Sequence, residues 1–277
     1  MANRYNVRSI SFPSRSHPTT LKIEEQIKKL KTLVISSESI CHGMLGLEDL
    51  YNGVNELLNL SSTQQVLSHH QNGKFLDRLL DGSVRLLDIC GITRDVLLQF
   101  KEQVQSLQSA FRRRKGDSSL ESNIDNYACF RKKMKKDAKK FIAVLKQMDT
   151  KLEASLLEDQ DYHLIQLFKE VSLVTSFTFQ SFLSFLSTSR PKKTRWSVIS
   201  KLMNKGAIEC EEKQEIVNQL ESVDSLLKER LNAEKMKIAQ KGLEALEMSI
   251  GDLENCLENM FRLLIKTRAS ILNIISQ

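Results

Sequence analysis

The amino-acid sequence predicts an all-α protein, an elongated bundle of long antiparallel helices with a coiled-coil-like C-terminal helix. Three observations predict this fold class. The 277 residues include only three prolines and ten glycines, so long uninterrupted helices are allowed. Apolar residues recur at helical spacing through most of the chain. Near the C-terminus, apolar positions alternate steps of four and three residues with one polar member: Leu246, Ile250, Leu253, Leu257, Met260, Leu264, Thr267, Ile271 and Ile274.

We name these nine positions the terminal seam. Their alternation is a heptad pattern, which is typical of a helix packed along most of its length against other helices. The seam belongs to a stretch from about Gln214 to Ile275 that we interpret as one long helix, on which the other helices pack. Its apolar stripe loses phase between Arg230 and Lys241, as a stutter would produce. The pattern therefore favours a bundle helix over a continuous two-stranded coiled coil, with a homo-oligomer as the alternative.

Residues 1–18 are predicted to form a disordered basic arm rich in Ser and Arg. The arm contains Arg4, Arg8 and Arg15, and no acidic residue precedes Glu24. Its two prolines and many serines leave little apolar surface to offset the entropy of ordering. The composition is compatible with an organelle transit peptide, and the competing interpretation is an arm with Arg-x-x-Ser phosphorylation sites. No apolar segment typical of a signal peptide is present, so a secretory leader is not expected.

Residues 19–277 are predicted to form one helical domain. Thr19 or Thr20 is expected to cap a first long helix that continues to Leu58. Two glycines weaken the middle of this helix and predict a kink there: Gly43 and Gly46.

A short helix is expected next, before the turn signal Asn72-Gly73, and then a second long helix from about Phe75 to Arg114. Gly82 and Gly91 lie inside that helix, where each costs about 1 kcal/mol relative to Ala. Each therefore indicates the close approach of another helix or, alternatively, a break. The predicted core face carries Leu76, Leu79, Leu80, Leu86, Leu87, Cys90, Leu97, Phe100, Val104, Leu107 and Phe111.

A third helix is predicted from about Ser119 to Leu157, and it is strongly basic in its middle. Its buried stripe is expected to contain Tyr127, Phe130, Met134, Phe141, Val144, Leu145 and Met148. The following helix, residues 162–188, has no charged residue from Val171 to Ser189. That length suits a transmembrane span, but its many Ser and Thr residues favour a central buried helix. Residues 190–206 are predicted to form a basic linker and a short amphipathic helix that places Trp196 in the bundle.

The net charge of +7 is concentrated in three blocks, Arg112–Lys115, Arg131–Lys140 and Arg190–Arg195. Such blocks are commonly solvated helix faces, and they can also bind a phosphate-bearing surface. An anionic membrane surface is the partner that these blocks, together with the 171–195 region, would suit. Nucleic acid is not expected as a partner, because no recognised binding module occurs and aromatic residues are not interleaved with the lysines.

No catalytic, cofactor-binding or metal-binding residue is predicted, and we expect a protein that is not an enzyme. The five cysteines are scattered without a C-x-x-C pair, which argues against zinc and fits a reducing compartment. The adjacent His69 and His70 point apart on a helix. Nucleotide-binding, hydrolase and metalloprotease motifs are absent. Three acids of the second long helix are expected to form ion pairs with neighbouring arginines: Asp77, Asp81 and Asp88 with Arg78, Arg85 and Arg94.

Several segments resemble a plant-specific family of unknown molecular function that is related to the BYPASS proteins. They are Arg8 to Pro18, Leu79 to Gly91, Phe130 to Lys136, Trp196 to Met203, and Leu263 to Asn273. The resemblance spans nearly the whole chain in order. It implies a role in root and shoot development through control of a mobile signal, and it implies no catalytic or ligand residues.

The sequence thus predicts a non-enzymatic helical interaction and regulatory protein whose protein partners it does not identify. The alternative is a peripheral membrane-associated protein that uses the basic blocks and the 171–195 region. The expected location is intracellular and cytoplasmic, with a membrane-associated or organellar location as the alternative.

Overall fold

The computed structural model describes residues 17–36, 40–68, 73–113, 117–154, 163–187, 215–229 and 232–276. These residues form eight α-helices and no strand, which confirms the all-α prediction. In chain order the helices are α1 (Pro18–Ser36), α2 (Ile40–Leu58), α3 (Ser61–Ser68), α4 (Gly73–Arg113), α5 (Asp117–Ala154), α6 (His163–Leu186), α8 (Glu215–Leu226) and α9 (Ala233–Ile275). The predicted arm, apart from its last two residues, and the predicted linker with Trp196 lie outside the described residues.

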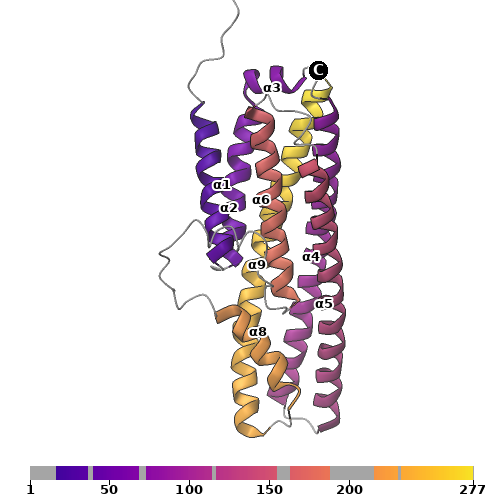
Figure 1. Ribbon diagram of the computed structural model, residues 1–277. Helices are drawn as coiled ribbons and strands as arrows, with labels where there is room; N and C mark the ends of the chain where they lie inside the picture. The colour runs from indigo at the N-terminus through magenta and orange to yellow at the C-terminus, as the bar shows by residue number, and fades with distance from the viewer. Residues whose placement is uncertain are drawn as a thin grey trace, which may run out of the picture.

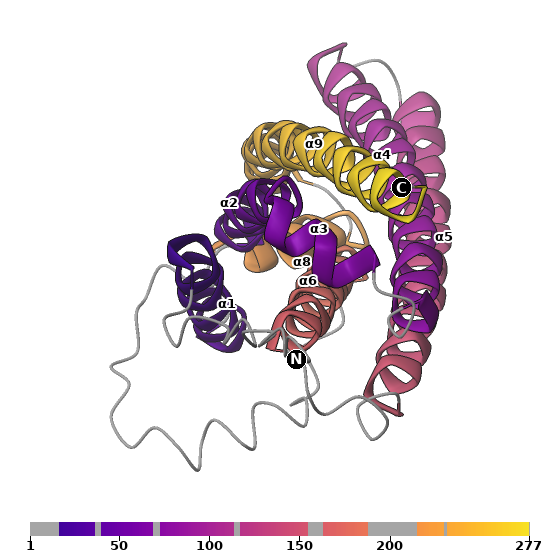
Figure 2. The same ribbon diagram turned by 90° about the horizontal axis from the view of Figure 1, so that it is seen from above.

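The helices form an elongated bundle in which α4, α5 and α9 run along most of the length (Figure 1). Helices α1, α2 and α6 occupy one half, α3 crosses its end, and α8 packs against α9 in the other half. Seen along the axis, successive neighbours close a ring in the order α4, α9, α2, α1, α6, α5 (Figure 2). Most neighbours are antiparallel as predicted, but two neighbouring pairs are parallel. Helix α2 runs parallel to α9, because Glu48 contacts Asn259 and Asn55 contacts Thr267. Helix α1 runs parallel to α6, because Glu24 contacts His163 and Lys31 contacts Glu170.

The terminal seam is buried along its whole length, as predicted. All nine positions lie in the core, and the stripe continues toward the N-terminus through Leu243 and Ala239. The seam packs against α4, α2 and α8, so one helix supports three others. The coiled-coil character of α9 itself stays a prediction.

The terminal stretch is nevertheless two helices, and the prediction of one long helix with a stutter was wrong. Helix α8 ends at Leu226, and α9 begins at Ala233 after an N-cap at Asn232. The Asn232 side chain accepts a hydrogen bond from the Lys235 amide at 2.8 Å, which satisfies a free donor of the first turn. Helix α8 then packs back along α9. The loss of phase in the sequence therefore marks a reversal of the chain.

The predicted first helix is also two helices, because α1 and α2 are separate and lie side by side. A Cβ atom at Gly46 would lie 2.7 Å from Leu30 Cδ2, and one at Gly53 would lie 3.2 Å from Ile23 Cγ1. These glycines let two helices approach closely, so the predicted kink was wrong. The expected Thr cap was also wrong, since α1 begins at Pro18 and the Thr19 amide donates to His17 Nδ1 at 3.3 Å.

The three middle helices agree with the predictions except at two glycines. Helix α4 continues through Gly82 and Gly91 without the alternative break. A Cβ at either glycine would make only ordinary van der Waals contact, so the close helix approach predicted for these two glycines was wrong. The α5 stripe packs on the core through Tyr127, Met134 and Leu145. Helix α6 is buried on most of its surface, as expected for a central helix. Within the described part of the chain, no helix is long and apolar enough to cross a membrane.

Two glycines of α9 give a matched test of the packing between α8 and α9. A Cβ at Gly242 would lie 2.8 Å from Val223 Cγ2, whereas a Cβ at Gly251 meets nothing within 4 Å. Valine has a stiff, fully buried side chain here, so Gly242→Ala should destabilise the fold by about 1–3 kcal/mol. Gly251→Ala should stabilise it by about 0.5–1 kcal/mol through helix propensity. Urea unfolding of both variants measures the difference, and equal shifts would contradict the close approach of α8.

Candidate functional site

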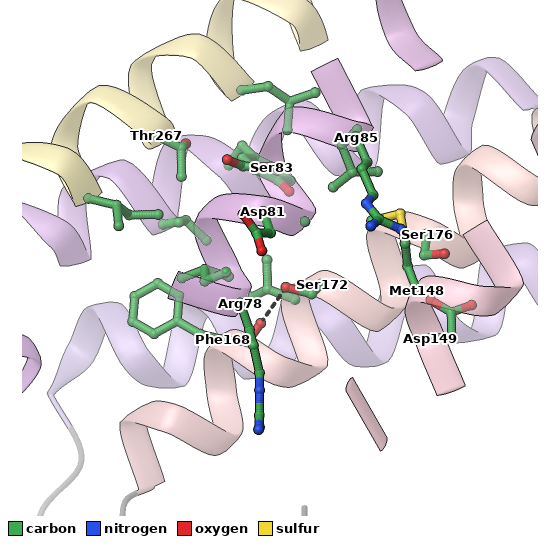
Figure 3. A pocket seen from close by; sticks show the side chains of 18 residues that line it. Arg78, Asp81, Ser83, Arg85, Met148, Asp149, Phe168, Ser172, Ser176 and Thr267 are labelled. Atoms are coloured by element: carbon green, nitrogen blue, oxygen red, sulfur yellow. Dashed lines mark hydrogen bonds between the residues drawn. The ribbon is translucent and has the colours of Figure 1, made fainter. Parts of the chain in front are cut away.

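A cavity of about 490 Å³ lies in the half of the bundle that contains α1, α2 and α6 (Figure 3). Helices α4 and α6 line opposite sides of it, and α2, α5 and α9 complete the wall. We call it the α4–α6 cavity. Its apolar lining residues are Tyr51, Val54, Leu79, Leu86, Met148, Phe168, Val171, Leu264 and Ile271, and its polar lining residues are Arg78, Asp81, Ser83, Arg85, Asp149, Ser172, Ser176 and Thr267.

The hydroxyl groups of the cavity wall are already hydrogen-bonded to the protein. Ser172 Oγ donates to the Phe168 carbonyl at 3.0 Å, and this bond is drawn in Figure 3. Thr267 Oγ1 donates to Asn55 Oδ1 at 3.0 Å, which joins α9 to α2. Burial raises the pKa of Tyr51 to about 12, so its hydroxyl stays neutral. The inner wall therefore offers few free polar groups.

Four charged side chains also line the cavity. Arg78, Asp81 and Arg85 come from successive turns of α4, and Asp149 comes from α5 (Figure 3). Gln180 Nε2 donates to Asp149 Oδ2 at 2.8 Å. Among the described residues, no ion pair or hydrogen bond holds the side chain of Arg85 or of Asp81.

The ion pairs predicted within α4 were wrong for Arg94, because its guanidinium reaches Glu258 of α9. That contact belongs to a row of polar contacts between the antiparallel helices α4 and α9. Lys101 pairs with Glu254 at 2.6 Å, and Gln105 and Gln108 donate to the two carboxylate oxygens of Glu247. The two helices are therefore held in one register along about four turns of α4.

A buried charge cluster joins α5, α6 and α8. Arg131 is 2% exposed and donates to both carboxylate oxygens of Asp224, at 3.1 and 3.0 Å, and to the Leu186 carbonyl at 3.0 Å. Tyr127 and Lys135 donate to the same carboxylate, each at 3.0 Å. We call this group the Asp224 cluster. Arg131 begins the second basic block, so that block is not a solvated face throughout.

The Asp224 carboxyl is charged in the folded protein. Burial alone would raise its pKa, but hydrogen bonds and positive charge from Arg131, followed by Lys135, outweigh that effect. The pKa of Asp224 therefore lies below its usual range. Burial, together with the adjacent Asp224 charge, raises the pKa of the Tyr127 hydroxyl, so Tyr127 remains a hydrogen-bond donor.

The remaining lysines of this block form an exposed surface on α5, which we call the lysine face: Lys132, Lys133, Lys136, Lys139 and Lys140. They lie on the side of α5 away from its buried stripe. No acidic side chain in the described part of the chain pairs with any of these five. For these residues the prediction of a solvated face was right.

The thiols of Cys90, which is buried, and Cys256, which is partly buried, stay protonated at neutral pH. Burial raises the pKa of Cys90 to about 12 and that of Cys256 to about 11. Cys90 Sγ donates to the Leu257 carbonyl at 3.6 Å, which fits its predicted place in the core. His69, His70 and Cys210 lie outside the described residues. No group of three or more potential metal ligands occurs in the part that the structure describes.

The cavity and the Asp224 cluster were not predicted as sites, whereas the lysine face lies within the basic block Arg131–Lys140 that the sequence offered as a binding surface. Arg131 and Asp224 are 93 residues apart, so no local pattern links them. The lysine face could be found from the spacing of its lysines, once Arg131 and Lys135 are removed from the block.

A family model described as Protein BPS1 matches residues 43–274. No curated protein and no solved structure matches the chain significantly.

Proposed function

Because the chain belongs to the BPS1 protein family, we propose that it is a non-enzymatic helical interaction and regulatory protein that acts in plant root and shoot development. The observation that carries the interaction role is the lysine face. Five positive charges stand on one side of a rigid helix, with no acidic partner among the described residues. Such a surface attracts and orients an acidic partner.

The partner that this surface suits best is an acidic protein segment. None of the large exposed apolar residues that the structure describes lies on α5, so this surface recognises charge rather than an apolar anchor. Lysines on flexible stems adapt to carboxylates without the fixed geometry that arginine imposes. Binding of this kind weakens with added salt, because exposed charges are screened.

Neutralising the five lysines tests this proposal. Changing all five to Gln should remove acidic proteins from affinity capture out of plant tissue, measured by mass spectrometry, without loss of folding. The matched control changes five scattered exposed lysines to Gln: Lys22, Lys28, Lys228, Lys237 and Lys241. The control loses the same net charge and should retain the partners. Equal capture by both variants would contradict a role for the lysine face.

An anionic membrane surface is the second candidate partner, because lysines near such a surface contribute about 1 kcal/mol each. The predicted membrane role also used the 171–195 region. That part of the prediction is not supported, since Val171 to Ser187 pack inside the bundle. Flotation with phosphatidylserine vesicles at low salt separates the two candidates. Binding that the five-lysine variant loses would favour the membrane, and absence of binding would remove it.

A further inference from the structure

We propose that the α4–α6 cavity binds a small apolar molecule that carries one anionic group. Its volume of about 490 Å³ falls within the range of about 300–1,000 Å³ that small-molecule sites occupy. This proposal does not depend on the lysine face, which lies on the outer surface of α5.

The walls of the cavity determine the body of the ligand. Met148 of α5 and Phe168 of α6 present apolar surface to the cavity (Figure 3). Leu86 of α4 also lines it. Water in contact with that surface is released when an apolar group replaces it. The hydroxyls of Ser172 and Thr267 are bonded within the protein, and Ser83 Oγ is bonded to Arg268 and to the Leu80 carbonyl. A polar ligand body would therefore gain little here.

The charged groups determine the head of the ligand. Arg85 lines the cavity from α4 with a guanidinium that no described residue holds, and Arg78, about two helical turns away on the same helix, adds a second positive charge. A guanidinium matches a carboxylate through two parallel hydrogen bonds. Of the two acids in the lining, Asp149 already accepts a hydrogen bond from Gln180. Asp81 remains, and its charge disfavours ligands with several negative groups.

A ligand series with one apolar body and three heads tests the assignment on the full chain. Octanoate, octanol and octylammonium are titrated while the isotope-labelled methionine methyl signals are followed by nuclear magnetic resonance. Met148 lines the cavity and should shift, whereas Met248, which is 75% exposed on α9, should not. We expect octanoate to bind about tenfold more tightly than octanol, as a charged hydrogen bond implies. Tighter binding of octylammonium, or no shift of Met148 with any of the three, would overturn the proposal.

Two pairs of variants locate the site. Gly82 lines the cavity, and a Cβ there would lie 3.8 Å from Met148 Cε, so Gly82→Leu should fill the space. It should weaken octanoate binding at least about tenfold without lowering the melting temperature, because Leu favours a helix. Gly251→Leu, on an open surface, is the control and should bind as the wild type does.

The second pair tests the head group. Arg85→Gln should weaken octanoate about tenfold and leave octanol unchanged. Arg113→Gln, at the far end of α4, should change neither. Wild-type binding by both Gly82→Leu and Arg85→Gln would show that the ligand binds elsewhere.

Discussion

Replacing Leu246 and Leu257 together by Ala should leave little folded protein. Both side chains are fully buried in the terminal seam, and neither lines the α4–α6 cavity. Each Leu→Ala change in a core costs about 2–5 kcal/mol, because the removed methyl groups leave a cavity. The two sites are eleven residues apart on one helix, so the costs should add to about 4–10 kcal/mol. That loss is comparable to the whole stability of a domain, about 5–15 kcal/mol.

Exposed apolar residues of the same helix supply the matched control. Ile265 is 47% exposed and Leu272 is 41% exposed, and the double change of these residues to Ala should shift stability by only about 1 kcal/mol. Thermal melts followed by circular dichroism, at two protein concentrations, measure both variants. A loss that depends on concentration would indicate a seam shared between two chains. Similar small effects for both pairs would mean that the bundle is organised around another helix.

The second large effect should come from the Asp224 cluster. Asp224→Ala leaves the Arg131 guanidinium buried without its counter-charge, which should cost about 3–5 kcal/mol. Replacing both residues by apolar side chains, Arg131→Met with Asp224→Leu, should cost much less, because no charge is then buried alone. Urea unfolding of the single and double variants measures the coupling. Equal losses in the single and the double variant would show that the charges do not act as a pair.

The same carboxylate should make the protein sensitive to acid. The pKa of Asp224 is lower in the folded chain than in the unfolded chain, where it is about 3.9. Its contribution to stability is therefore fully present above that value and is lost as the pH falls through the folded pKa. The wild type should lose more stability than Asp224→Asn between neutral pH and about pH 3, measured by urea unfolding. A parallel decline in both proteins would assign the acid sensitivity to other groups.

Features that depend on regular spacing were predictable from the sequence. The terminal seam and the α4 and α5 stripes follow the helical period, and the structure buries them accordingly. Two chain reversals were missed. After Ser36 the apolar spacing continues into the next helix, and after Leu226 the loss of phase was interpreted as a stutter within one helix. The N-cap of α9, Asn232, is a single polar residue in a charged stretch, so the sequence pattern did not indicate a helix start there. The period of a helix indicates which side is buried, but it does not indicate where the chain turns.

The candidate sites are formed by residues that lie far apart in the sequence, so the helical period of any one segment does not reveal them. Arg131 stands in a run of lysines, so its sequence context indicates solvent, yet Asp224 of α8 and the end of α6 enclose it. The α4–α6 cavity is formed where five helices meet, and no single helix carries a sign of it. The glycines of α2 were similarly ambiguous, since a kink and a close contact require the same small residue.

The position of α9 after the helices that it packs on has a consequence for biosynthesis. Its seam packs against α2 and α4, and its contact between Asn259 and Glu48 spans 211 residues. A ribosome releases these helices long before it completes the helix that they pack on. Until then the apolar faces of α2 and α4 lack their largest partner and are exposed to contact with other chains. Folding should therefore be largely post-translational and slow for a helical protein, as its long-range contacts predict.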